Sequence, residues 1–191
     1  MDFTREVEAA AHVAGLTNRS LSSIQDDTQN FLLRIITENP GIWYREILRL
    51  TGLPNGTLSY HLRELEEAAR IKVQRIDHLG KTRYYSASVP DSETNIIACV
   101  KIATARQIIL VLIDREFCTF SELVSSVDKS PSTISWHLKR LISSGIVGVR
   151  HGELSLYSLA ERDAVIEVLS KYRESILDTV VNNYTDLIDE L

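Results

Sequence analysis

The residues best suited to chemistry in this chain occur twice, in two similar strings. GTLSYHLREL begins at Gly56 and STISWHLKRL begins at Ser132, an offset of 76 residues. Each string places short hydroxyl side chains before an aromatic residue, a histidine and a basic residue. At the start of a helix such hydroxyls cap backbone N–H groups, and the helix end itself attracts anions such as phosphate. The repeat therefore predicts two small domains of one kind.

The other reactive side chains do not form a recognisable catalytic or metal-binding pattern. His61 and His137 are equivalent in the two copies, but no cysteine, aspartate or second histidine recurs around both at ligand spacing, so packed structural histidines are expected. Cys99 and Cys118 stand apart, which favours buried free thiols. The sequence lacks a glycine-rich phosphate loop, GxSxG and HExxH. We expect no enzyme activity, no metal and no cofactor.

Length and composition fit two small globular domains. The chain has 191 residues, of which 44% are apolar and 25% charged. Lys101 and Arg106 interrupt its most apolar stretch, so no membrane span is expected. The N-terminus lacks the basic end and apolar centre of a signal peptide, which predicts a cytoplasmic protein.

Charge is distributed unevenly around the net value of −5. Residues 45–85 contain eight basic and five acidic side chains, a net of +3, whereas residues 161–191 contain three basic and eight acidic side chains, a net of −5. The acidity therefore belongs largely to the C-terminal segment. The repeated modules can still present basic faces.

The elements around each string predict the same small domain. In the first copy, residues 31–41, 42–52 and 53–70 read as three helices, and two strands follow with a glycine-containing tip. The second copy repeats this plan, with Ser130 as helix cap, Gly145 as terminator and a wing four residues shorter. Ala69 stands where Gly145 closes the second copy, so the left-handed turn is expected to be either strained or replaced there. The predicted fold is mostly α with small β-hairpin wings (α+β): two tandem winged helix-turn-helix domains plus a long C-terminal helix.

The string STISWHLKRLISSGIV resembles the recognition-helix signature of ArsR/MarR-type winged helix-turn-helix transcription regulators. Archaeal regulators with two such domains in tandem resemble it most, and the resemblance covers roughly residues 30–160. It implies a DNA-binding regulator in which the third helix of a module enters the major groove of double-stranded DNA. The predicted contact residues lie on the two third helices and on the first wing: Thr57, Ser59, Tyr60, Arg63, His78, Lys81, Arg83, Ser132, Thr133, Ser135, Trp136, Lys139 and Arg140.

Structural alternatives exist for the same residues. The hydroxyl side chains are also ordinary helix caps, and Arg63 can pair with Glu67 on a solvated helix face. Tyr60 and Trp136 can instead fill an interface between modules or subunits. The alternative function is accordingly a winged-helix adaptor that binds another protein without reading DNA. An unidentified effector is possible, but no residue pattern names one.

The C-terminal segment carries a long apolar seam. Its members recur at spacings of three and four, which predicts a helix of about 30 residues that pairs two chains as a homodimer. The alternative is that this helix folds back across the first domain. The seam residues are Leu169, Tyr172, Ile176, Val180, Tyr184 and Leu187. The predicted organisation is an arm at 1–28, winged domains at 29–89 and 105–160, a linker helix at 90–104, and the C-terminal helix at 161–191.

Overall fold

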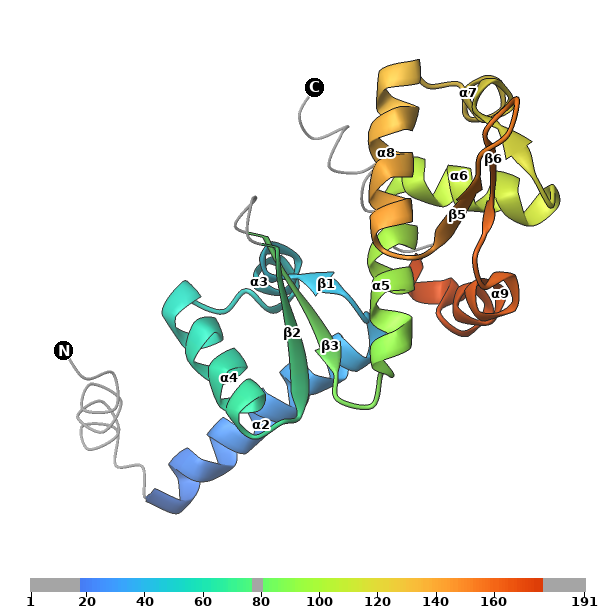
Figure 1. The fold of residues 1–191 in the computed structure, drawn as a ribbon. Coiled ribbons are helices and arrows are strands. Elements are labelled where there is room, and N and C mark those ends of the chain that lie inside the picture. The colour runs from blue at the N-terminus through green and yellow to red at the C-terminus, as the bar shows by residue number, and fades with distance from the viewer. Residues whose placement is uncertain (1–17, 77–80, 177–191) are drawn as a thin grey trace. The chain divides into compact units, whose positions relative to one another are not determined.

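A computed structural model describes residues 18–76 and 81–176 of the chain. Its contacts divide into two compact units, with the division between Ala87 and Ser88. Each unit contains helices and one three-stranded antiparallel sheet, drawn as helices and arrows in Figure 1. The predicted tandem of two helix-turn-helix domains in a mostly helical chain is confirmed.

Among its described residues, the first unit has three helices and a sheet with the order β1-β3-β2. Its elements are α2 (Asn18–Glu38), β1 (Ile42–Trp43), α3 (Tyr44–Thr51), α4 (Asn55–Glu67), β2 (Ile71–Ile76) and β3 (Lys81–Ser86). Gly52, at positive φ, caps the end of α3, and Gly41, also at positive φ, lies between α2 and β1. Helix α2 begins at Asn18, so the predicted boundary between arm and domain at residue 28 falls inside a helix.

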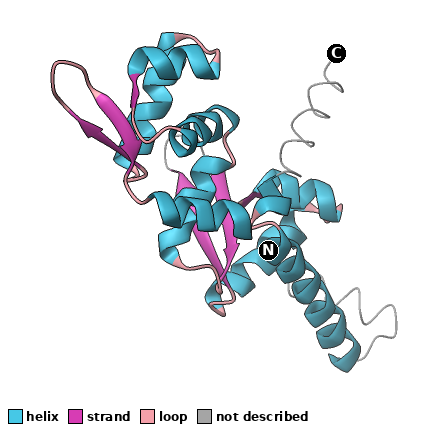
Figure 2. Cartoon of the chain, turned by 90° about the vertical axis from the view of Figure 1, so that its right-hand side faces the viewer, coloured by secondary structure: helices cyan, strands magenta, loops and turns pink. Residues whose placement is uncertain are grey.

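The second unit repeats this arrangement between two further helices. Its elements are α5 (Asp91–Val100), α6 (Ala103–Asp114), β4 (Cys118–Thr119), α7 (Phe120–Val127), α8 (Pro131–Ser143), β5 (Val147–Arg150), β6 (Leu156–Leu159) and α9 (Arg162–Lys171). The sheet order is β4-β6-β5, which matches the first unit strand for strand. Figure 2 shows the small sheets in magenta among cyan helices.

The two hydrophobic cores use equivalent positions. Leu58 and Leu65 of α4 are fully buried, and so are Ile134 and Leu141, which lie 76 residues later on α8. The apolar stripe at i, i+4 and i+7 thus packs each third helix against its own unit. This packing leaves the opposite face of each third helix at the surface.

The third helices end in the same turn, although the residue at the turn differs. Ala69 adopts a φ of 52°, and Gly145 adopts 73° at the equivalent place. In both units the next amide donates to a helix carbonyl, from Arg70 to Leu65 and from Ile146 to Leu141. A left-handed alanine costs roughly 1 kcal/mol, so the first unit forms the same turn at some expense.

The strand registers correct the expected wing length. Tyr84 pairs with Val73 in the first hairpin, and Tyr157 pairs with Val149 in the second. Val149 lies 76 residues after Val73, but Tyr157 lies only 73 after Tyr84, so the second hairpin is three residues shorter rather than four.

In the described part of the chain, no single helix is long and apolar enough to cross a membrane. The pair α5 and α6 passes that test only jointly and bends by 106°.

Candidate nucleic-acid interface

Helix α8 begins at a cap built from hydroxyl side chains. The Ser130 Oγ accepts the Thr133 backbone N–H at 3.3 Å, and Pro131 occupies the first turn. The Ser130 hydroxyl also contacts the hydroxyls of Ser132 at 3.0 Å and Thr133 at 2.8 Å. Ser132 and Ser135 are exposed beside this cap. The helix start therefore presents a cluster of hydroxyls together with the positive end of the helix dipole.

The exposed face of α8 carries an aromatic ring and two cations. The Trp136 side chain is 53% exposed, and the Arg140 guanidinium lies 4.8 Å from the centroid of its ring. Lys139 is exposed one residue before Arg140. Within residues 18–76 and 81–176, neither cation forms an ion pair with an acidic side chain. This face is therefore positive and uncompensated.

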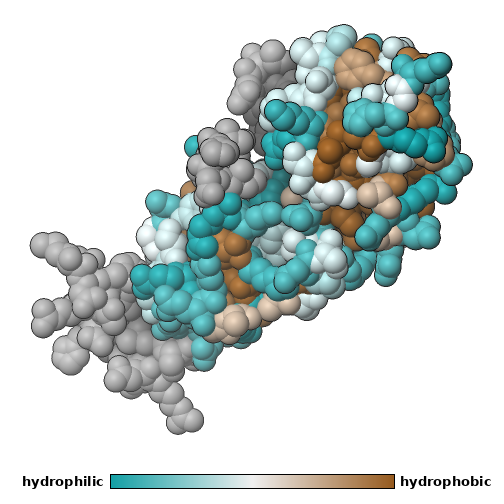
Figure 3. All heavy atoms as spheres, viewed as in Figure 1, coloured by the Kyte–Doolittle hydropathy of each residue, from teal (hydrophilic) through white to brown (hydrophobic). Residues whose placement is uncertain are grey.

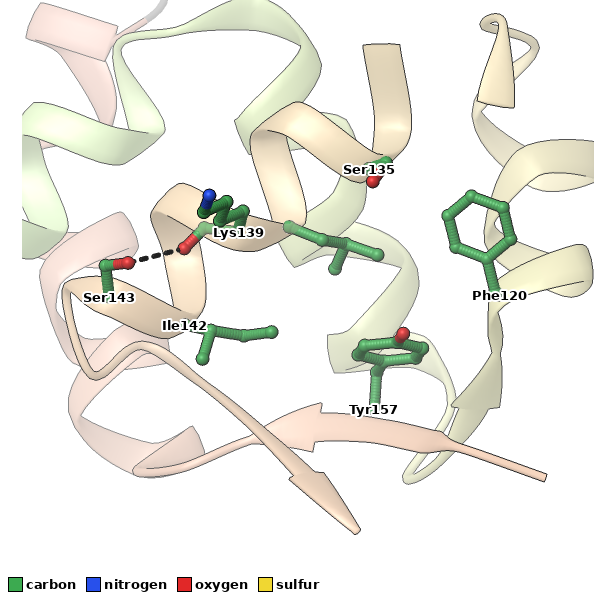
Figure 4. A pocket seen from close by; sticks show the side chains of 7 residues that line it. Phe120, Ser135, Lys139, Ile142, Ser143 and Tyr157 are labelled. Atoms are coloured by element: carbon green, nitrogen blue, oxygen red, sulfur yellow. Dashed lines mark hydrogen bonds between the residues drawn. The ribbon is translucent and has the colours of Figure 1, made fainter. Parts of the chain in front are cut away.

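A groove of about 240 Å³ runs between α8 and the wing of the second unit (Figure 4). Apolar side chains of Leu138 and Ile142 lie beside polar ones, and Figure 3 shows hydrophobic atoms reaching the surface of this unit. The lining residues are Phe120, Ser135, Leu138, Lys139, Ile142, Ser143 and Tyr157. The groove thus joins the cationic face of α8 to the hairpin.

Helix α4 of the first unit has the same position but a different surface. Tyr44, the equivalent of Phe120, uses its hydroxyl to contact the Ser59 Oγ at 2.8 Å and to donate to the Asn55 carbonyl at 3.1 Å. Ser59 is therefore engaged within the unit, whereas the equivalent Ser135 lines the groove of the second unit. Thr57 is half-buried at the start of α4.

The cations near α4 are paired with carboxylates. The Arg75 guanidinium donates to both carboxylate oxygens of Glu66, at 2.9 and 2.7 Å. Arg63 lies 3.6 Å from Glu67, which is the i,i+4 pair expected as an alternative from the sequence. Ile142 and Ser143 occupy the positions of these two glutamates on α8. The surface of α4 is thus electrically compensated where that of α8 is not.

Tyr60 also differs from its counterpart Trp136. Its hydroxyl accepts a hydrogen bond from the Gln25 Nε2 of α2 at 3.1 Å, and the side chain is half-buried. The aromatic residue of the first unit therefore attaches α4 to α2. The aromatic residue of the second unit remains at the surface.

The first wing requires one correction. Arg83 was expected to contact DNA but is 1% exposed, because its Nη1 donates to the Gly41 carbonyl at 2.7 Å and its guanidinium lies 3.8 Å from the Trp43 ring centroid. Its charge is used inside the fold and is not presented to a partner. Lys81 begins β3, but its side chain and the whole of His78 lie outside the described residues.

Two family models match the chain, one on each unit. The model described as "Bacterial regulatory protein, arsR family" matches residues 103–149, which run from α6 to β5. A model of an N-terminal HTH domain matches residues 26–97. Each unit therefore contains an HTH domain, and the one in the second unit matches the arsR family. ArsR-family proteins are non-enzymatic, DNA-binding transcriptional regulators, so the predictions of family, of transcription regulation and of a non-enzymatic protein are confirmed.

A curated relative and several solved structures resemble this regulator. The relative is the uncharacterized HTH-type transcriptional regulator MJ1398 of Methanocaldococcus jannaschii, 28% identical over 122 residues, or 64% of this chain and 30% of the relative. The chain therefore spans under a third of that protein's length.

Among the structures, the transcriptional repressor BigR of Xylella fastidiosa is 24% identical, with a TM-score of 0.37, over 41% of this chain and 81% of its own. Rv0081 of M. tuberculosis is 26% identical, with a TM-score of 0.39, over 49% and 92%. At these TM-scores the likenesses carry no further conclusion.

Each third helix carries an equivalent histidine on its buried side. His61 and His137 are buried, and their rings meet those of Tyr60 and Trp136 edge to face at 5.2 and 4.7 Å. Burial lowers the pKa of both imidazoles, so both are neutral at pH 7. Among the described residues, no group of three His, Cys, Asp or Glu side chains is placed to hold a metal ion.

The C-terminal seam of the regulator differs from the expected continuous helix. Helix α9 ends at Lys171, and Leu169, Tyr172 and Ile176 pack against the core of the second unit. The Tyr172 hydroxyl and the Lys171 Nζ both bind the carboxylate of Glu93 on α5. These three seam residues therefore face their own chain, on the second unit and not across the first domain. Val180, Tyr184 and Leu187 lie outside the described residues.

Proposed function

We propose that this regulator reads duplex DNA through α8 of the second unit. The observation that carries the proposal is the pair of uncompensated cations, Lys139 and Arg140, on the exposed face of α8. The major groove of B-DNA admits one α-helix and displays a distinct pattern of donors and acceptors for each base pair. Cations on the entering face neutralise phosphates and reach base edges.

The hydroxyl cluster at the start of α8 supports a second set of contacts. Ser132, Thr133 and Ser135 lie where the backbone N–H groups and the helix dipole attract an anion. A DNA strand that passes between the major groove and the next minor groove crosses the space between a recognition helix and its wing. We place the phosphate contacts of these hydroxyls, and of Lys139 at the groove, along this strand.

In this proposal the first unit does not read bases through α4. The cations Arg63 and Arg75 are paired with glutamates, and the Ser59 hydroxyl is engaged by Tyr44. The contacts expected of Thr57, Ser59, Tyr60 and Arg63 are therefore left out of the proposed surface. Those of His78 and Lys81 in the first wing stay predictions.

We also propose that the regulator acts as a homodimer in the cytoplasm. ArsR-family regulators bind DNA, often as homodimers. Two copies of α8 would then contact half-sites about 34 Å apart, one helical turn of DNA. Light scattering of the purified chain, free and bound to duplex, measures the number of copies.

A fluorescence-anisotropy titration tests the proposal. The labelled duplexes are the region upstream of the protein's own gene and a shuffled control, each at two salt concentrations. The expected result is tighter binding to the native duplex, with an affinity that falls as salt rises because phosphate contacts release counterions. Equal or absent binding to both duplexes would contradict it.

A further inference from the structure

The Trp136–Arg140 pair on α8 is not required by the fold. Single exposed apolar residues are common on proteins and carry no message by themselves. Trp136, however, lies in the middle of the exposed face of α8 and is 53% exposed, while the core is formed by the opposite stripe of the same helix. A large ring at this position contacts any partner that binds the exposed face of α8.

The ring and the guanidinium hold one another in place. The Arg140 guanidinium lies 4.8 Å from the ring centroid, which is within the range of a cation–π interaction. No carboxylate in the described part of the chain pairs with this guanidinium, so its N–H donors are available for a partner. The stacked arginine loses less side-chain entropy on binding than a freely rotating one would.

The chemistry of the pair matches two particular base edges. A guanidinium donates two parallel hydrogen bonds to O6 and N7 of guanine, and an apolar side chain packs against the 5-methyl group of thymine. The 4.8 Å separation of guanidinium and ring is comparable to the spacing of about 3.4 Å between successive base pairs. One stacked pair can therefore touch two neighbouring bases.

Resting on the proposed function, we infer that Trp136 and Arg140 together read a thymine next to a guanine in the major groove. Trp136 packs on the thymine methyl, and Arg140 binds the guanine. This assigns a sequence preference to α8 as well as an affinity for phosphate.

The first unit holds a ring and a guanidinium in a different setting, because the Arg63 guanidinium lies 5.9 Å from the centroid of the Tyr60 ring. The hydroxyl of Tyr60 is bonded to Gln25, and Glu64 stands at the position of Arg140. Arg63, the basic residue of α4, is paired with Glu67. The preference should therefore come from α8 alone.

The test begins with selection of bound sequences from a random duplex library by the full-length wild-type chain. The expected product contains a thymine adjacent to a guanine. In that duplex, replacing the thymine by uracil removes only the methyl group and should weaken binding about fourfold, the effect of burying one methyl-sized group. Replacing the guanine by 7-deazaguanine removes N7 and should weaken binding roughly tenfold.

The variants assign each effect to its side chain. Trp136→Ala should abolish the uracil effect and retain the 7-deazaguanine effect, whereas Arg140→Ala should do the reverse. Phe117→Ala is the matched control, because Phe117 is also an exposed ring under an arginine, Arg150 at 5.1 Å, but lies off α8. It should leave both effects unchanged. Circular dichroism checks that each variant is folded.

Two results would overturn the inference, and a third would contradict the proposed function as well. A selected sequence without adjacent thymine and guanine, or base effects that persist in both α8 variants, would refute this readout while leaving the proposed function intact. Failure to select any sequence would contradict the proposed function itself.

Discussion

Helices α4 and α8 occupy the same place in two copies of one domain, yet they present opposite surfaces. Both bury their apolar stripe at equivalent positions, such as Leu58 and Ile134. On the outer face, α4 carries Glu66 and Glu67 bound to arginines, while on α8 neither Lys139 nor Arg140 pairs with a carboxylate in the part of the chain that the structure describes. The comparison teaches that the repeat preserves what the core needs and leaves the binding surface free to diverge.

The difference extends to the wings and to the elements beside the helices. In the first unit Arg83 of β3 is drawn into the fold by the Gly41 carbonyl and the Trp43 ring. At the paired strand positions of the second unit stand Leu156 and Thr119, which need no such contact. Arg83 of the first unit thus serves its stability, whereas Lys139 of α8 is exposed.

The largest expected effect is on the stability of the first unit. Arg83→Ala removes a buried charged hydrogen bond and the cation–π contact with Trp43, and should lower the free energy of unfolding by about 2–3 kcal/mol. Urea denaturation followed by the fluorescence of Trp43, in a Trp136→Phe background, measures it. Arg45→Ala removes an exposed arginine and should change stability by less than about 0.5 kcal/mol. If Arg83→Ala weakened DNA binding without a loss of stability, the prediction would be wrong and Arg83 would be a DNA-contacting residue.

Removal of one cation from α8 should have the next largest effect. Lys139→Ala should weaken binding to duplex DNA roughly tenfold at low salt and reduce the salt slope by about 1, because one phosphate contact is lost. Arg63→Ala makes the equivalent change on α4 and should alter neither quantity. Anisotropy titrations across a series of salt concentrations measure both, and equal effects of the two variants would break the distinction between the helices.

A pH-dependent effect is expected where α9 meets α5. Burial alone would raise the pKa of Glu93, but hydrogen bonds from Lys171 and Tyr172 outweigh it and lower the pKa. Such a carboxylate adds stability above its ordinary pKa and loses it as pH falls through the lowered value. Glu93→Gln should therefore destabilise the chain by roughly 1 kcal/mol at pH 7, with the difference shrinking in acid. Denaturation curves at pH 7 and pH 3.5 measure this, and a constant difference would contradict it.

The smallest effect is expected at the surface of α4. Glu66→Ala removes the ion pair with Arg75, whose side chain is 62% exposed, so the stability should fall by less than about 1 kcal/mol. The same variant frees a cation beside α4. Thermal denaturation measures the loss of stability. A gain of DNA affinity in titrations would show that the ion pair alone had prevented the surface of α4 from binding DNA.

The fold was predictable from the sequence because its signals are local and repeated. The apolar stripe containing Leu58 and Leu65, the cap at Ser130 and the glycine at 145 each act within one or two turns of helix. The left-handed turn at Ala69 was predictable in the same way, since the repeat supplied Gly145 as its template.

The candidate site was less predictable because its state depends on contacts distant in sequence. The burial of Arg83 requires the Gly41 carbonyl, 42 residues away, and the position of Tyr60 depends on Gln25, 35 residues away. The seam of α9 looked continuous because spacing alone does not reveal the break at Tyr172, whose hydroxyl binds Glu93. The sequence did not predict that Phe120 and Tyr157 line the groove. The available signal was that the second copy has Phe120 where the first copy has Tyr44.

The most direct test of the central claim exchanges one charge between the two helices. Arg140→Glu gives α8 the residue that α4 carries at the equivalent position, and Glu64→Arg does the converse. Anisotropy titrations of both full-length variants against the native upstream duplex should show a loss of roughly a hundredfold for Arg140→Glu, because a cation that faces the DNA becomes an anion that the DNA repels. Glu64→Arg should bind as the wild type does or slightly more tightly. An unchanged affinity for Arg140→Glu, with the fold intact, would contradict the claim that α8 reads the DNA.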